Sequence, residues 1–116
     1  MIMKSLVLVA ALGAVALGFP GTAAAATSFE VCTPAGCAVQ SVRGTVDRGT
    51  VVATVSDSSP VSALTAEFSV SPPGVRTRVV VDDGVKRAMF RLPVGATQLI
   101  VTACGAGGCA SKSIPL

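Results

Sequence analysis

Residues 99–113 read Leu-Ile-Val-Thr-Ala-Cys-Gly-Ala-Gly-Gly-Cys-Ala-Ser-Lys-Ser, with cysteines at positions 104 and 109. An apolar, β-branched run leads into a glycine-rich loop of four residues, and a second strand-like run follows. We therefore expect Cys104 and Cys109 to face each other where a hairpin closes. At a non-hydrogen-bonded site of an antiparallel pair the two Cα atoms lie about 4.5 Å apart, a separation that a disulfide spans.

Outward from this hairpin, the chain back to residue 27 keeps the same character. Runs rich in Val, Thr, Ser and Ile alternate with short segments containing Gly, Pro or Asp, and no helical periodicity is present. The sequence predicts seven or eight short strands: Phe29–Cys32, Cys37–Val46, Thr50–Ser56, Ser62–Ser71, Arg76–Asp82, Val85–Leu92, Gln98–Cys104 and Cys109–Ile114. Strands at this spacing predict an all-β fold, an antiparallel two-sheet sandwich of immunoglobulin-like type.

The segments between the strands carry turn residues. Asp47-Arg48-Gly49 and Asp57-Ser58-Ser59-Pro60 each link two strands, and Pro72-Pro73-Gly74 suits a turn with glycine at a positive φ. Asp83-Gly84 predicts a two-residue type I′ hairpin. In that register Asp82 pairs with Val85, Val80 with Arg87, Arg78 with Met89 and Arg76 with Arg91.

The amino-terminal residues predict export. Met1 to Lys4 carry one positive charge, an uncharged apolar stretch runs from Ser5 to Phe19, and Ala24-Ala25-Ala26 offers small residues for cleavage. The apolar stretch is short for a bilayer core of about 30 Å, so a signal peptide of residues 1–26 is favoured over an uncleaved anchor. We expect a secreted mature domain, residues 27–116, with no membrane span after cleavage.

Cysteine usage agrees with export. All four cysteines lie after residue 26, in two pairs of equal spacing, Cys32–Cys37 and Cys104–Cys109. Such a pattern in a small exported chain favours disulfides over a metal site, and the chain contains no histidine. Three connectivities are open. A six-residue ring contributes roughly 2 kcal/mol by chain entropy and a link across the whole domain roughly 4, but local pairing is geometrically easier and is favoured.

The hairpin of residues 99–113 resembles the last hairpin of bacterial fibronectin type III and immunoglobulin-like modules, in which a cysteine-bridged, glycine-rich loop joins the final strands. The run from Gly44 to Ile114 is similar to such modules in rhythm, although it lacks the core Trp and the Tyr of the penultimate strand. The loop from Cys32 to Val39 also resembles the short cysteine loop of the neocarzinostatin family, secreted sandwiches that carry small molecules.

One group of cations is a candidate site. The predicted 83–84 hairpin places Thr77, Val79, Val81, Ala88, Phe90 and Leu92 on a core face, and it gathers Arg76, Arg78, Arg87 and Arg91 on the opposite face. Four guanidinium groups on one ribbon could bind phosphate, sulfate or an anionic envelope polymer. The simpler interpretation is a solvated face whose cations keep an edge hairpin soluble.

Composition argues against several other functions. Without histidine, a free thiol or a convincing carboxylate pair, we expect no enzyme and no cofactor. Turn aspartates at 47, 57, 82 and 83 could form a calcium site, but such residues are common in turns without a metal. The mature part has no Trp or Tyr and carries a charge of 8 − 6 = +2, so nucleic acid is not an expected partner. We expect a non-catalytic binding or structural module of the cell envelope or extracellular space, with another protein or an anionic envelope polymer as its partner. The alternative is a small-molecule carrier with a cleft between the sheets.

Overall fold

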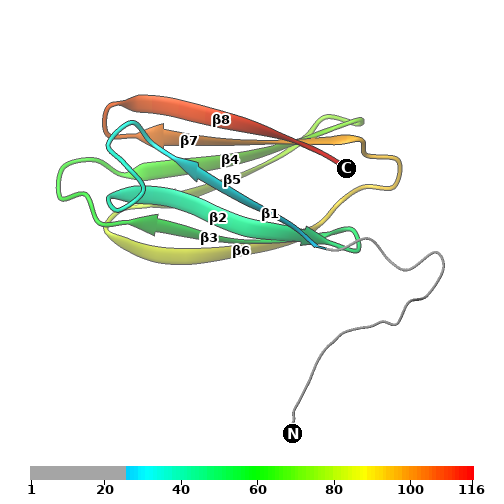
Figure 1. Cartoon of the computed structure of the whole chain (residues 1–116), viewed down its shortest axis with the longest axis horizontal. Coiled ribbons are helices and arrows are strands. Elements are labelled where there is room, and N and C mark those ends of the chain that lie inside the picture. The colour runs from blue at the N-terminus through cyan, green and yellow to red at the C-terminus, as the bar shows by residue number, and fades with distance from the viewer. Residues whose placement is uncertain (1–25) are drawn as a thin grey trace, which may run out of the picture.

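Eight β-strands account for most of residues 26–116, the part of the chain that this computed structural model describes (Figure 1). They are β1 (Thr27–Cys32), β2 (Gln40–Asp47), β3 (Thr50–Asp57), β4 (Leu64–Ser71), β5 (Val75–Val81), β6 (Gly84–Arg91), β7 (Gln98–Gly105) and β8 (Gly108–Pro115). The described part contains no helix, and hence none long and apolar enough to cross a membrane. The predicted signal peptide lies outside the described residues except for Ala26.

The strands form two antiparallel sheets of four. The order is β1-β2-β3-β6 in the first sheet and β5-β4-β7-β8 in the second. The chain crosses between the sheets three times, from β3 to β4, from β5 to β6 and from β6 to β7. The two sheets lie one above the other in Figure 1. The prediction of an all-β, two-sheet antiparallel sandwich is therefore confirmed, with eight strands.

Alternation along the strands builds the core. In β3 and β4 every second residue is buried, because successive side chains of a strand point to opposite faces of its sheet. Phe68 of β4 is fully buried and meets Phe90 of β6 edge-on, with ring centroids 5.4 Å apart. The core draws on both sheets; its buried apolar residues are Phe29, Val31, Val42, Val51, Ala53, Val55, Leu64, Ala66, Phe68, Val70, Val81, Ala88, Leu99, Val101, Ala103 and Ile114.

Three hairpins match their turn sequences. Asp47 pairs with Thr50, so Arg48-Gly49 is a two-residue loop with positive φ at both positions, as a type I′ turn requires. Gly74 takes a φ of 95° between β4 and β5, as predicted. In the β7–β8 hairpin Cys104 pairs with Cys109, and the disulfide joins them across a Cα separation of 4.0 Å. This pairing was predicted and is confirmed.

The prediction of a hairpin at Asp83-Gly84 is wrong. β5 pairs with β4 and β6 pairs with β3, so this segment carries the chain from one sheet to the other. None of the four predicted cross-strand pairs between residues 76–82 and 85–91 forms. The observed register places Arg78 opposite Glu67 and Arg91 opposite Thr50, whereas the hairpin would have set Arg76 against Arg91. Opposite charges across strands are favourable and like charges are not, which favours the observed arrangement.

Two predicted strands begin too early. Residues 37–39 belong to a turn, and β2 starts at Gln40; residues 62 and 63 precede β4, which starts at Leu64. The Cys32–Cys37 disulfide, with a Cα separation of 4.9 Å, closes the loop that follows β1. Within this loop the N–H of Gly36 donates to the Thr33 carbonyl and that of Gln40 to the Gly36 carbonyl. Because these hydrogen bonds and the predicted disulfide hold residues 37–39 in a turn, β2 begins only at Gln40.

Candidate functional site

Four connections gather at one end of the sandwich, which we call the loop end. They are the disulfide loop of residues 33–39, the β3–β4 loop of residues 58–63, the β5–β6 link of residues 82–83 and the β7–β8 loop of residues 106–107. These connections lie on the left in Figure 1. Loops at the end of a sandwich are where such folds commonly bind partners.

A buried glutamine ties these loops together. Gln40, at the start of β2, is fully buried, and its Oε1 accepts hydrogen bonds from the Thr33 hydroxyl at 2.9 Å and the Ala106 N–H at 2.8 Å. Its Nε2 donates to Asp57 Oδ1 at 3.1 Å and to the Ser62 carbonyl at 3.0 Å. One side chain therefore contacts three loops and the end of β3.

Asp57 extends this network. Its buried carboxylate also accepts the Ser59 N–H at 2.8 Å and lies 3.4 Å from the Asp83 N–H, which belongs to the link between the sheets. Ser59 Oγ in turn accepts the N–H groups of Val61 and Ser62, both at 3.3 Å. A buried carboxylate costs free energy unless it is hydrogen-bonded, and here its partners are the Gln40 amide and backbone N–H groups of the loops. Its position thus fixes the loop backbone.

The two disulfides reinforce the same end. A Cβ placed on Gly107 would lie 3.2 Å from Pro34 Cβ, so the two disulfide-closed loops touch. A Cβ on Gly105 would come within 2.4 Å of Gln40 Oε1; only glycine allows the glutamine to reach the β7–β8 loop. Ser58 binds the other side of the first loop, because its N–H donates to the Val39 carbonyl at 2.9 Å. The loop end is cross-linked by two covalent bonds and one buried polar network.

The loop end presents small apolar residues and two carboxylates to solvent. Pro34, Ala35, Pro60 and Val61 are exposed, with Val61 84% accessible, and so are the aspartates of the 82–83 link. Next to these loops a hollow of about 340 Å³ is lined by residues of the 37–39 turn and of the β5–β6 link. A rigid surface of this composition suits contact with a protein, because little loop freedom is lost on binding.

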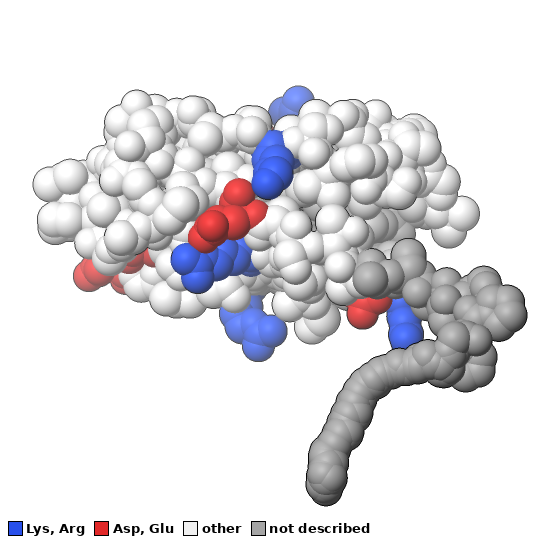
Figure 2. All heavy atoms as spheres, viewed as in Figure 1, with Lys and Arg blue, Asp and Glu red and all other residues white. Residues whose placement is uncertain are grey.

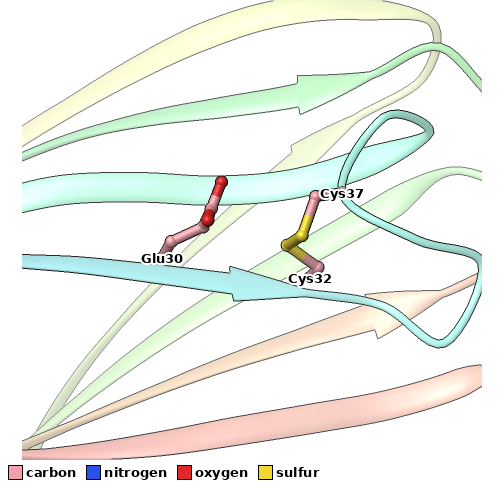
Figure 3. Close-up of side chains that lie close together, drawn as sticks. All are labelled: Glu30, Cys32 and Cys37. Carbon is pink, nitrogen blue, oxygen red and sulfur yellow. A yellow bond between two sulfur atoms is a disulfide. The ribbon is translucent and has the colours of Figure 1, made fainter.

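Glu30, Cys32 and Cys37 lie close together, and their oxygen and sulfur atoms come within 4.8 Å of one another (Figure 3). The two sulfurs are joined in the disulfide, so they offer no thiolate to a metal. The Glu30 carboxylate accepts a hydrogen bond from Nε of Arg43. This cluster is therefore a covalent link beside an ion pair.

The four predicted arginines do not form one ribbon. Arg76 and Arg78 lie on β5 and each has a guanidinium nitrogen 3.8 Å from Glu67 Oε2. Arg87 and Arg91 lie on β6, in the other sheet. All four are exposed, as predicted, but the two pairs occupy the outer faces of opposite sheets. The face seen in Figure 2 likewise shows a few charges of both signs without a broad patch of either.

Of the turn aspartates, Asp57, Asp82 and Asp83 lie at the loop end and Asp47 does not. Asp47 ends β2 at the far end of the sandwich from Asp57, and Asp57 is engaged by the loop network. Among residues 26–116 these aspartates do not converge as a set of three possible ligands. The calcium arrangement considered from the sequence thus has no geometric basis in this part of the chain.

Gln40 was not identified from the sequence, although a signal was present. Gln40 has the same parity as Val42, and Asp57 has the same parity as Val51, Ala53 and Val55, so both polar residues occupy positions where alternation places core side chains. Two polar residues at core positions predict a buried hydrogen-bonded pair. Among the described residues, no buried side-chain nitrogen or oxygen lacks a partner.

A second hollow, of about 420 Å³, lies at the opposite end of the sandwich. Both sheets contribute to it, with Val46 from the first and Pro115 from the second, and the β6–β7 connection supplies Leu92, Val94 and Ala96. Its lining is mostly apolar.

Comparison of the sequence with protein-family models and with curated proteins, and of the structure with solved structures, finds no significant match.

Proposed function

We propose that this chain is an exported, non-catalytic module of immunoglobulin-like or fibronectin type III-like character that binds a protein through its loop end. The observation that carries the proposal is the convergence of three loops and a buried aspartate on Gln40, with a disulfide in each of two neighbouring loops. A protein that needed only a stable sandwich would gain little from so much local restraint in surface loops.

The fold supports the comparison with type III modules. Two antiparallel sheets, β1-β2-β3-β6 and β5-β4-β7-β8, are compatible with the sandwich architecture that immunoglobulin-like and type III modules share. The cysteine-bridged hairpin of β7 and β8 occupies the position of the final hairpin. Fold alone names no ligand, so the binding function rests on the loop end.

Export is supported by the disulfides together with the amino-terminal sequence. Disulfides persist in oxidising compartments, and all four cysteines are paired. We expect the secreted protein to begin near Thr27 and to weigh four hydrogens less than the reduced chain by intact mass spectrometry. A protein that keeps residues 1–26, or free thiols in the secreted form, would contradict this part of the proposal.

Binding is tested by site-specific photo-crosslinking in the producing cells. A photoreactive residue replaces Val61 at the loop end or, as a matched control, Val94, which is fully exposed at the opposite end. We expect the Val61 probe to capture one protein that the Val94 probe does not, and Ala35→Glu to abolish that capture. Equal capture from both positions, or none from Val61, would refute a protein-binding loop end.

The second candidate function is a small-molecule carrier, favoured by the apolar hollow of about 420 Å³ between the sheets. This volume falls in the range of small-molecule sites. Native mass spectrometry of the secreted protein tests this function, because a carrier should show a reproducible added mass that Ala96→Trp removes. An unmodified mass in every preparation would exclude a retained ligand.

A further inference from the structure

β6 is an unpaired sheet edge with an unusual side-chain pattern. It pairs with β3 on one side and has no strand on the other within residues 26–116; in Figure 1 it borders the lower sheet. Its outer face alternates apolar and cationic residues in the order Val85, Arg87, Met89 and Arg91. Val85 is 64% and Met89 72% exposed. The free backbone N–H and C=O groups of such an edge can pair with another strand.

Charge distinguishes this edge from the other edges. Of the eight Lys and Arg residues of the described part, five lie on β5 and β6. On β5 both arginines lie near Glu67, and on β1 Glu30 pairs with Arg43. Lys86, Arg87 and Arg91 of β6 have no carboxylate within 4.0 Å among the described residues. The edge is cationic and uncompensated.

We propose that β6 binds an extended segment of another protein in which acidic and apolar residues alternate, added as an antiparallel strand to the first sheet. The pattern read along that segment is acidic-x-apolar-x-acidic-x-apolar, which sets carboxylates opposite Arg91 and Arg87 and apolar side chains opposite Met89 and Val85. Directly opposed residues on one face of an antiparallel pair interact most strongly. Main-chain bonds supply affinity and the alternating side chains supply selectivity.

The same charges explain why the partner is not a second copy of this chain. Two β6 edges placed side by side would bring arginines and lysines of both copies together, which is unfavourable. Cationic residues on an edge strand thus protect against self-pairing, while they leave the edge open to an acidic strand. Protection of the edge against self-pairing does not explain the exposed Met89 and Val85, because polar residues along the whole strand would protect it better.

The test uses the mature, oxidised protein and synthetic heptapeptides with blocked ends. ETLTETL is titrated to about 1 mM, where binding by a short strand is still measurable, and amide chemical shifts are followed by NMR. We expect the largest shifts at residues 84–91 and no comparable effect of KTLTKTL. Two further peptides carry N-methyl groups either on the Glu and Leu residues or on the Thr residues. Because alternate residues of a strand direct their N–H groups to opposite edges, one set should abolish binding and the other should spare it.

Two double variants form a matched pair. Arg87→Gln with Arg91→Gln on β6 should weaken binding of ETLTETL roughly tenfold, since two cross-strand charge pairs are lost. Arg76→Gln with Arg78→Gln removes the same charge from β5 and should leave binding unchanged. Unperturbed β3 and β4 amide shifts in the free variants confirm that both remain folded.

Several results would overturn the proposal: no shift at β6, equal binding of both peptides, retention of binding by both methylated peptides, or equal weakening by both double variants. The β6 variants leave Val61 unchanged, so crosslinking at the loop end reports separately on the proposed function.

Discussion

Replacement of Gln40 by leucine should destabilise the domain and loosen its loop end. Leucine has a similar volume and remains buried, but it makes none of the four hydrogen bonds of the glutamine. The buried Thr33 hydroxyl loses its acceptor, and Asp57 Oδ1 keeps only the Ser59 N–H, at the place where three loops and β3 meet. A polar group that loses its partner in a buried position costs more than the net value of the bond that was broken.

The magnitude follows from the groups left behind. A hydrogen bond to a charged carboxylate contributes about 1.5–3 kcal/mol, and a buried group left unsatisfied, here the Thr33 hydroxyl, costs about 1–3 kcal/mol. The half-buried Ala106 N–H and Ser62 carbonyl can reach water, so both add little. Burial of the leucine methyl groups offsets about 1 kcal/mol. We expect a net loss of about 3 kcal/mol, which for a domain of this size lowers Tm by roughly 12–24 °C.

Urea denaturation of the oxidised protein of residues 27–116 measures this loss, and Gln98→Leu is the matched control. Gln98 is exposed and makes one side-chain bond, a 2.6 Å contact from its Nε2 to Ser113 Oγ. The control should change the free energy of unfolding by less than about 0.5 kcal/mol. In Gln40→Leu, hydrogen exchange should accelerate at residues 58–63 and 106–107. A loss below about 1 kcal/mol, or equal effects of the two substitutions, would refute the interpretation that Gln40 holds the loops of the loop end together.

Three further changes test the packing and the covalent links. Gly44→Ala should cost about 1–3 kcal/mol by thermal unfolding, because its Cβ would lie 2.4 Å from the backbone oxygen of Val52; an unchanged Tm would contradict this close approach. Replacement of both Cys104 and Cys109 by alanine should cost about 2 kcal/mol in urea, the value for a six-residue ring, and a loss above about 4 kcal/mol would show that the bond does more than close its loop. Phe68→Ala removes a fully buried ring and should cost about 3–5 kcal/mol in the same assay; a loss under 2 kcal/mol would place the centre of the core elsewhere.

Much of the fold could be predicted because alternation is a local property. The residues assigned to the core face of the 76–92 region, Thr77, Val79, Val81, Ala88, Phe90 and Leu92, are buried or half-buried, and the arginines between them are exposed. This assignment holds although the predicted hairpin does not form. A strand that needs one face covered shows the same pattern whether its neighbour precedes or follows it in the chain.

The neighbour itself could not be predicted from local sequence. Asp83-Gly84 has the composition of a type I′ turn and, like Arg48-Gly49, a positive φ at both positions. Arg48-Gly49 closes a hairpin, whereas the Asp83 segment crosses between the sheets. The choice depends on which other strands are available to pair with β5 and β6, a property of the whole chain. The separation of the arginines follows directly from it, because they belong to different sheets.

The placement of the two disulfides is informative beyond their number. Each closes a six-residue ring and so contributes about 2 kcal/mol, whereas a single link across the domain would contribute about 4. Both rings lie at the end that Gln40 organises, and the opposite end has neither a disulfide nor such a network among the described residues. Selection for global stability alone would favour long links, whereas local rings restrain the loops that contain them.

This difference can be measured within one molecule. If the rings act locally, replacement of all four cysteines by alanine should accelerate hydrogen exchange at residues 33–39 and 105–108 by a larger factor than in the central strands β3 and β4. Exchange in those strands reports on unfolding of the whole domain, and so on the summed loss of stability. Equal acceleration throughout would mean that the disulfides stabilise the sandwich as a whole, and it would remove the main reason to place a binding surface at the loop end.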